Sequence, residues 1–174
     1  MTTLYEATRD LHHVCEAHPV GASMFNGTIT EQHWCDWLGV LYSIHSAIDP
    51  RLPVYAHVSG ELTLDLVEML PLTPRPGPVA VADRFAASLT TPAQIAGTAY
   101  VLVGAHRRGG QMTRKRLLEA GRSLPMRHVD FFAPKEAEAL VKWLREIREP
   151  TVTSAGRDTF ALLLAAMNEI EGRA

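Results

Sequence analysis

The sequence predicts an all-α protein. Apolar residues recur every three or four positions in most segments, and no segment of useful length alternates with the period of a β-strand. Hydrophobic residues make up 47% of the 174 positions, which is enough to build the core of one multi-helical bundle over residues 1–174. The 17 basic and 19 acidic residues nearly balance, and this argues against a nucleic-acid-binding face.

Helix boundaries are expected where capping residues, prolines and glycines occur. Thr2 or Thr3 can cap a first helix that ends near Ala17, before Pro19. Further helices are expected at residues 22–25, 31–48, 62–70, 79–89, 92–120, 135–148 and 154–171. The proline-rich connector 71–78 is expected to lack regular structure. The long helix after Thr91-Pro92 is expected to be interrupted near Gly109-Gly110.

Cysteine usage and the N-terminal residues predict a cytoplasmic protein without a membrane span. Cys15 and Cys35 form no CxxC pattern and are expected to be buried, reduced thiols. The first residues lack the basic and apolar regions of a signal peptide. No apolar run approaches the ~18 residues that a membrane helix needs.

His12 is the leading candidate for a metal ligand. On a helix, Thr8, Arg9, Cys15 and Glu16 would share its face, which we expect to be the inner one. A ligating imidazole needs an acceptor at its second nitrogen, and Glu16 could supply one directly or through water. Arg9 could pair with an anionic group along the helix. The same spacing also suits a hydrogen-bonded core histidine beside a surface ion pair.

The opening helix resembles that of the heme oxygenases. The likeness runs without gaps from Leu4-x-Glu6-Ala7-Thr8-x-x-x-His12-x-x-x-Glu16, through Met24-Phe25-x-Gly27-x-Ile29-Thr30, to Leu41-Tyr42-x-Ile44-x-x-Ala47-Ile48-Asp49. It implies that heme lies between this proximal helix and a glycine-kinked distal helix. By the same resemblance His12 ligates the iron, Glu16 holds the imidazole, and Arg9 lies near the propionates. His13 points about 100° away and is expected to face solvent.

The segment Gly97–Gln111 resembles the distal helix, in one of two registers. Alignment on Gly104 leaves one inserted residue, which would bulge the helix. We prefer alignment on Gly109-Gly110, which requires no bulge and places Ala105 at the family's first glycine. His106 then stands where the family often has an aspartate, either as a proton relay through water or as a sixth iron ligand. A plain turn between two shorter helices is the alternative at Gly109-Gly110.

The remaining pocket residues are also assigned by resemblance. Tyr100 matches a tyrosine near the propionates, and Phe160 matches an aromatic wall residue of the last helix. Lys142, Arg145 and Arg148 are the candidates for the basic residue that holds a propionate. A place in the core accounts equally well for the aromatic residues. Arg107 and Arg108 either face solvent or contact propionates or a reductase.

The resemblance implies oxygen-dependent degradation of heme to biliverdin, carbon monoxide and ferrous iron. Heme b is then both substrate and cofactor. Electrons would come from an external reductase or ferredoxin, because no GxGxxG fingerprint is present. The alternative is a heme-binding or regulatory protein of the same fold without oxygenase activity. A related bundle without heme, such as a di-iron oxidase or a thiamin-related hydrolase, is a third possibility, although a paired Glu-x-x-His pattern is missing.

Overall fold

The computed structural model describes residues 2–172, and this part of the chain contains helices and connecting segments but no strand. The predicted all-α class is therefore confirmed. The α-helices are α1 (Leu4–Ala17), α2 (Pro19–Phe25), α3 (Glu31–Ile48), α4 (Ser59–Glu68), α5 (Pro76–Ser88), α6 (Pro92–Gly104), α7 (Gln111–Glu119), α8 (Pro134–Arg145) and α9 (Pro150–Glu171). Short 3₁₀ turns are η1 (Asp49–Arg51), η2 (Val54–Ala56) and η4 (Arg127–Val129), and η3 (Ala105–Gly110) is a π-helix.

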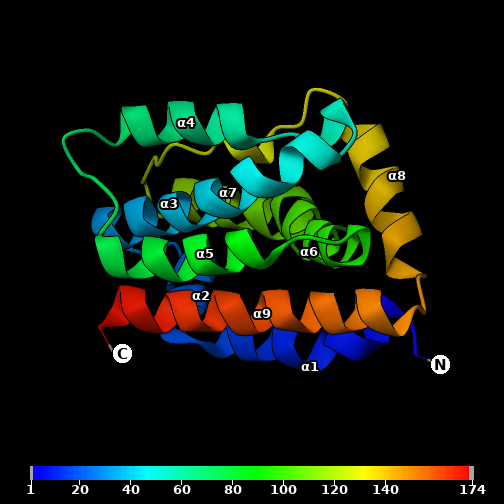
Figure 1. The fold of residues 1–174 in the computed structure, drawn as a ribbon. Helices are drawn as coiled ribbons and strands as arrows, with labels where there is room; N and C mark the ends of the chain where they lie inside the picture. Colours follow the sequence, from blue (N-terminus) through cyan, green and yellow to red (C-terminus); the bar gives the residue numbers. More distant parts are fainter. Residues whose placement is uncertain (1, 173–174) are drawn as a thin grey trace.

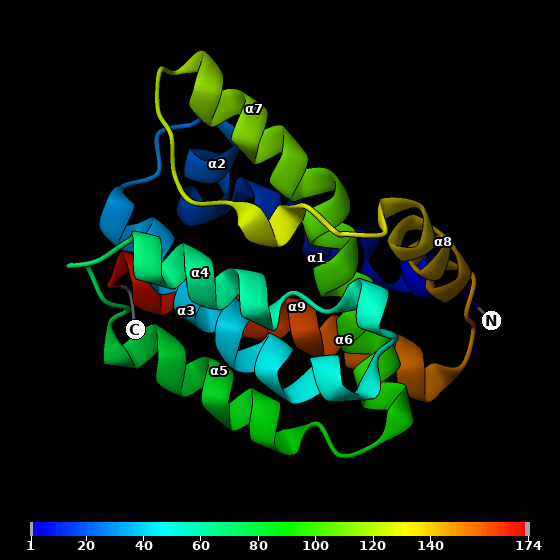
Figure 2. The ribbon, with the colours of Figure 1, turned by 90° about the horizontal axis from the view of Figure 1, so that it is seen from above.

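The helices are stacked in levels, with α8 crossing one end (Figure 1). Helix α4 lies above the level of α3, α5, α6 and α7, and α9 and α1 lie below it. Helix α9 packs against α1, α5 and α6, so it joins the lower level to the middle one. Seen from above, the continuous α6–η3–α7 helix runs obliquely across the molecule, and α7 ends at one corner (Figure 2). None of the helices among residues 2–172 is both long and apolar enough to cross a membrane.

Capping residues define the helix starts that the sequence signals most clearly. Thr3 accepts a hydrogen bond from the backbone N–H of Glu6, and the Glu6 carboxylate accepts one from the backbone N–H of Thr3 at 2.8 Å. Thr91 and Gln94 form the same reciprocal pair at the start of α6. Each pair satisfies two backbone donors that a helix end leaves open. Helix α1, and helix α3 with Thr30 as its N-cap, begin and end within a residue of their predicted bounds.

Several other predicted bounds were wrong, mainly at prolines. Helix α5 begins at Pro76, inside the connector expected to lack regular structure, because Pro76 and Pro78 occupy its first turn. A first turn needs no donor from proline, and its fixed φ suits the helix. Helices α2 and α9 also begin at prolines, three and four residues before their predicted starts. Helix α8 ends at Arg145, three residues short of its predicted end.

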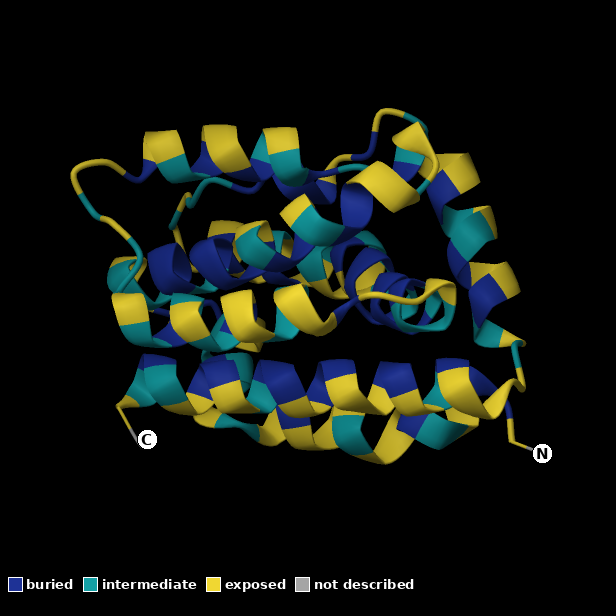
Figure 3. Ribbon diagram, in the orientation of Figure 1, coloured by how far each residue is buried: buried dark blue, intermediate teal, exposed yellow. Residues whose placement is uncertain are grey.

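The core lies where α3, α6 and α9 meet, and small residues bring the helices close together. Figure 3 shows buried positions on α3 and α6 and on the inward side of α9. A Cβ at Gly97 of α6 would lie 2.6 Å from the Val152 carbonyl oxygen, and one at Gly156 of α9 would lie 2.7 Å from Leu4 Cδ1. Larger side chains at these two positions would force α6, α9 and α1 apart. Buried Leu4 therefore holds the start of α1 against α9.

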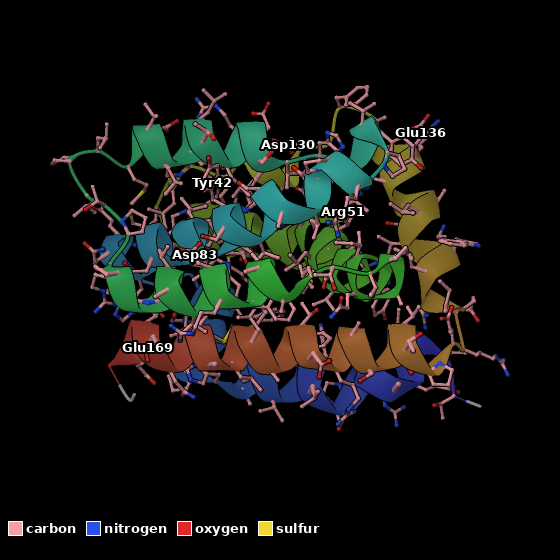
Figure 4. All side chains as sticks on the ribbon, in the orientation of Figure 1. Tyr42, Arg51, Asp83, Asp130, Glu136 and Glu169 are labelled. Atoms are coloured by element: carbon pink, nitrogen blue, oxygen red, sulfur yellow. The ribbon has the colours of Figure 1, made fainter. Side chains whose placement is uncertain are left out.

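Side-chain contacts also fix the connectors between the levels. Figure 4 labels two of the side chains involved, Arg51 and Asp130. The guanidinium of Arg51 donates a 2.8 Å hydrogen bond to the carbonyl of Leu89, which ties η1 to the end of α5. The carboxylate of Asp130 accepts hydrogen bonds from Arg114 at 2.8 and 2.7 Å. The segment after η4 is thereby held on α7.

The distal helix contains the bulge that our preferred register avoided. Residues Ala105–Gly110 form a π-helix, in which one turn accommodates an extra residue. Gly104 and Gly110 both keep right-handed helical angles, with φ near −60°. The glycines therefore do not break the helix, and the interruption predicted near Gly109-Gly110 takes the form of a widened turn. The alternative interpretation as a plain turn between two shorter helices was also wrong.

Candidate functional site

His12 lies on the open edge of α1, not on its inner face as predicted. Its side chain is 54% exposed, whereas Leu4, Thr8 and Cys15 form the buried stripe. The Glu16 carboxylate lies 3.6 Å from Nδ1 of the imidazole. The ring packs edge-on against Phe160 of α9, with centroids 5.8 Å apart. With Glu16 beside Nδ1 and Phe160 beneath the ring, Nε2 is the nitrogen left for a ligand.

The other candidates on α1 are also exposed. His13 faces solvent, as predicted, and its ring centroid is 6.1 Å from that of His12. Donor atoms of His12, His13 and Glu16 lie within 4.8 Å of one another, a spacing that could hold a metal ion. Arg9 is exposed one turn before His12. Cys15 is buried, which raises the pKa of its thiol to about 12, so the thiol is held in its protonated form.

Three helices meet at the beginning of α1. The Arg145 guanidinium of α8 stacks on the Tyr5 ring, 4.0 Å from its centroid. Tyr100 of α6 is half-buried beside these residues, and burial raises the pKa of its phenol. Opposing influences come from a hydrogen bond with Thr8 and from the charge of Arg145. The structure thus brings two predicted site residues, Tyr100 and Arg145, together.

The other two basic candidates from this region point elsewhere. Lys142 is exposed, one turn before Arg145, and lines a surface depression with Arg107 and Glu138. Arg148 lies beyond the end of α8, is exposed, and acts electrostatically on Glu6. Because α8 ends at Arg145, Arg148 does not share a helical face with the other two cations.

The two distal glycines have different surroundings. A Cβ at Gly109 would meet no atom within 4 Å, and neighbouring Ala105 is also exposed. A Cβ at Gly110 would instead overlap Cγ1 of Val129 in η4. Gly109 therefore keeps one face of the distal helix open, whereas Gly110 allows the helix to approach η4. In Figure 1 α1 lies below the level of α7, and in Figure 2 it passes behind this helix.

His106 points into the core. It is 3% exposed, and its Nε2 lies 2.9 Å from Nε2 of His45 in α3. The Nδ1 of His45 donates to the Asp49 carboxylate at 2.8 Å. The other Asp49 oxygen accepts hydrogen bonds from the backbone N–H groups of Val58 and Ser59 at 2.9 and 2.8 Å. A continuous Asp49–His45–His106 chain therefore runs from the end of α3 to the distal helix.

A second histidine–carboxylate pair flanks His106. The His128 ring of η4 lies edge-on to that of His106, with centroids 5.1 Å apart. Its Nδ1 donates to Asp65 of α4 at 2.6 Å, and Asp65 also accepts from the backbone N–H groups of Arg127 and His128. No hydrogen bond between described residues joins His128 to His106. The two histidines are in contact but belong to separate hydrogen-bonded pairs.

Burial governs the protonation of these groups. Desolvation lowers the pKa of His106 well below its usual value, and the neighbouring His45 and His128 lower it further. Desolvation also lowers the pKa of His128, although Asp65 opposes it. For Asp49, burial raises the pKa, but the hydrogen bonds from His45, Ser59 and Val58 and the His45 charge outweigh it, so the net shift is downward. Asp49 is thus an anion and His106 a neutral imidazole near pH 7.

Arg107 and Arg108 are held mainly by one carboxylate of α8. Arg108 donates to Glu138 at 2.9 Å, and Arg107 lies 4.0 Å from the other Glu138 oxygen. The Arg107 guanidinium also lies 6.0 Å from the centroid of the Phe131 ring. Of the predicted alternatives, the structure places Arg108 at the surface, where its side chain is 57% exposed.

Sequence reasoning missed the four residues that surround His106. Neither His45 nor Asp49 was predicted to be a site residue. Their spacing of four, on the buried face of α3, was the available signal. Asp65 and His128 are 63 residues apart, so no local pattern could have paired them.

Solved structures similar to this chain include those of two bacterial proteins. One is heme oxygenase-1 of the cyanobacterium Synechocystis, solved in complex with heme: its TM-score is 0.79 at 17% identity, over 97% of this chain and 90% of that protein. The other is the heme oxygenase of Leptospira interrogans: its TM-score is 0.76 at 16% identity, over 95% of this chain and 97% of that protein. No family model and no curated protein sequence matches the chain. Likeness at such low identity establishes the fold.

Proposed function

We propose that this chain, which has the heme oxygenase-like fold, binds heme b between α1 and the η3–α7 helix and degrades it with O₂ to biliverdin, carbon monoxide and ferrous iron. The main support is the exposed His12 imidazole: the Glu16 carboxylate lies 3.6 Å from its Nδ1, so Nε2 is the nitrogen left for the iron. Such a carboxylate fixes the tautomer and raises the basicity of a ligating histidine. An exposed imidazole against an aromatic wall, Phe160, fits a flat iron-containing ligand.

The opposite face also suits a flat ligand. Gly109 and Ala105 present only small, exposed positions on the distal helix. Close approach of a planar ring to a helix needs such positions, because a larger side chain would hold the ring away. In this proposal His12 binds the iron, while Ala105 and Gly109 lie against the other face of the ring. Arg9 adds positive charge to the same side of α1.

The propionates are assigned to the end where α1, α6 and α8 meet. Arg145 supplies a cation, and the Tyr100 phenol supplies a hydrogen-bond donor whose raised pKa keeps its proton in place. Arginine pairs with carboxylates through two parallel hydrogen bonds. Arg148 is a weaker candidate because it lies beyond α8, near Glu6.

When bound, heme would supply the redox-active iron and the reacting carbon of its own ring. The chain's residues would orient the ring, restrict its exposed edge and hold a proton on His106. Electrons would come from an external reductase or ferredoxin, in the cytoplasm. The Gly110–Val129 contact would hold the distal helix against η4 and so maintain its distance from α1.

A second candidate function is heme binding without degradation. The observation that favours it is His106, which burial keeps neutral and which therefore is not itself an acid. A sixth-ligand role for His106 would require its ring to leave His45.

Adding hemin to the purified chain and then ascorbate or a reductase in air separates these functions. We expect a Soret band that decays as biliverdin absorption grows. A stable spectrum after reduction would favour the binding function, and no spectral change with hemin would refute both.

A pair of adjacent substitutions tests the ligand assignment. His12→Ala removes the proposed iron ligand, so the Soret band should shift and the affinity for hemin should fall at least tenfold. His13→Ala removes another exposed imidazole of the same helix and should leave both unchanged. Equal effects of the two substitutions, or a His12→Ala spectrum identical to that of the wild type, would refute the assignment.

A further inference from the structure

The Asp49–His45–His106 chain has an order of donors and acceptors fixed by its ends. Asp49 is an anion that already accepts two backbone hydrogen bonds on one oxygen, so its other oxygen accepts from His45 Nδ1. Neutral imidazole carries one N–H. With that proton on Nδ1, the Nε2 of His45 is an acceptor, and His106 must donate from its Nε2 across 2.9 Å. The Nδ1 of neutral His106 is then a bare acceptor, and it makes no hydrogen bond to any described residue.

One added proton reverses this order. The Asp49 oxygen is 2.8 Å from His45, whereas His106 contacts the imidazoles of His45 and His128 and no carboxylate among residues 2–172. An opposite charge at that distance favours the charged form, so the added positive charge resides on His45. His45 then donates from both nitrogens. His106 must accept at Nε2, and its own proton moves to Nδ1.

We infer that Asp49 and His45 form a proton store for the distal helix, which switches His106 Nδ1 between hydrogen-bond acceptor and donor while His106 stays neutral. Asp49 and His45 are positioning residues, since they act only through His106. The store holds one proton and consists of side chains of this protein.

In the described part of the protein, other charged and titratable groups near the Asp49–His45–His106 chain make no hydrogen bond to His45 or His106. On η4, His128 contacts His106 through its ring, but its Nδ1 is held by Asp65 of α4. Arg114 of α7 is paired with Asp130 at 2.7 Å. Arg107, next to His106 on η3, lies 4.0 Å from Glu138, and its buried Nε has no hydrogen-bond partner among the described residues. His45 therefore has one anion in contact, Asp49, and one titratable acceptor, His106.

The inference extends the proposed function, on which its catalytic meaning rests. When a group beside the distal helix takes the proton from His106 Nδ1, His106 Nε2 takes the bridging proton from His45. His45 returns to the neutral form with its proton on Nδ1, and Asp49 is unchanged. One proton is delivered and one positive charge leaves His45, after which solvent reloads the store.

Nitrogen-15 NMR of the heme-free protein tests the switch directly. At pH 8 we expect His45 to carry its proton on Nδ1 and His106 to carry its proton on Nε2. On acidification the added positive charge should appear on His45, and the His106 proton should move to Nδ1 in the same step. Conversion of His106 itself to imidazolium, or a His106 proton that stays on Nε2 throughout, would overturn the inference.

Two variants control this experiment. His45→Gln keeps a hydrogen-bonding side chain next to His106 but removes the titrating group, so the His106 tautomer should no longer change with pH. His33→Gln makes the same change near the start of α3, about 18 Å along the helix from His45. In this variant the His106 tautomer should change with pH as in the wild type. A His106 tautomer change that survives in His45→Gln, with both variants folded by circular dichroism, would count against the store.

Rates of heme degradation by the wild type and the two variants distinguish failure of this inference from failure of the proposed function. If the wild type degrades heme, His45→Gln should lower the maximal rate about 100-fold and flatten the pH profile, whereas His33→Gln should match the wild type. Wild-type rates and pH dependence in His45→Gln would refute the proton store and leave the proposed function standing. A wild type that does not bind heme would refute the function, while the tautomer switch would still be judged by NMR.

Discussion

At the scale of single residues, His106 lies where its charged form is disfavoured. Its folded-state pKa is well below that of an unfolded histidine, near 6.5. Below pH 6.5, His106 therefore binds a proton more readily in the unfolded protein than in the folded protein. The stabilisation from neutral His106 is present above pH 6.5 and is lost as the pH falls below that value.

Urea unfolding at several pH values measures this effect. Between pH 7.5 and pH 5, the His106 contribution should lower the free energy of unfolding by about 2 kcal/mol. His106→Gln should be less stable at pH 7.5, because the core contact with His45 changes, but should lose less stability on acidification. Parallel pH profiles for the wild type and the variant would show that His106 is protonated in the folded state as readily as in the unfolded state.

The residue scale also shows the limits of sequence reasoning. The pairing of His12 with Glu16 was visible from their spacing, and the structure places them in contact. The exposure of His12 was not predicted, because helical periodicity does not show whether another helix covers that face of α1. Asp49 and His45 were overlooked because a histidine among apolar residues is usually assigned to the core. What gives them a chemical role is His106, 61 residues away.

At the scale of elements, the distal glycines give a matched pair of substitutions. Gly109→Ala adds a methyl group to open space in a helix, where alanine is favoured by up to about 1 kcal/mol. Gly110→Ala forces a methyl group against Val129 and should cost roughly 1–3 kcal/mol. Thermal unfolding should therefore rank Gly109→Ala at or above the wild type and Gly110→Ala clearly below it. The reverse ranking would mean that the helix faces are assigned incorrectly.

Element types were predictable where local chemistry decides them. Thr3 with Glu6 and Thr91 with Gln94 fix two helix starts through short-range hydrogen bonds. The prolines at 76 and 78 were misinterpreted because the same residue favours both a connector and a first helical turn. The π-helix corresponds to the bulge of the register aligned on Gly104, and the local sequence did not decide between that register and the one we preferred.

At the scale of the whole molecule, the two parts of the proposed heme site lie along α1. Tyr5 and His12 are seven residues apart, which corresponds to about 10 Å of helix. This length is comparable with the distance from the centre of a porphyrin to its propionates. Helices α6 and α8 bring Tyr100 and Arg145 to the Tyr5 end, and α9 brings Phe160 to the His12 end.

Heme-dependent stabilisation tests whether these distant helices form one site. A ligand that binds only the folded state, at 100 times its Kd, adds about 2.7 kcal/mol of stability, or several degrees in Tm. Arg145→Ala should reduce the Tm increase caused by hemin, because a lost propionate contact weakens binding about tenfold, or 1.4 kcal/mol. Lys142→Ala removes a cation one turn earlier in the same helix, at the depression lined by Arg107 and Glu138, so the hemin-dependent increase should be unchanged. A larger loss with Lys142→Ala than with Arg145→Ala would move the propionate site along α8 to the depression beside Glu138, away from Tyr5.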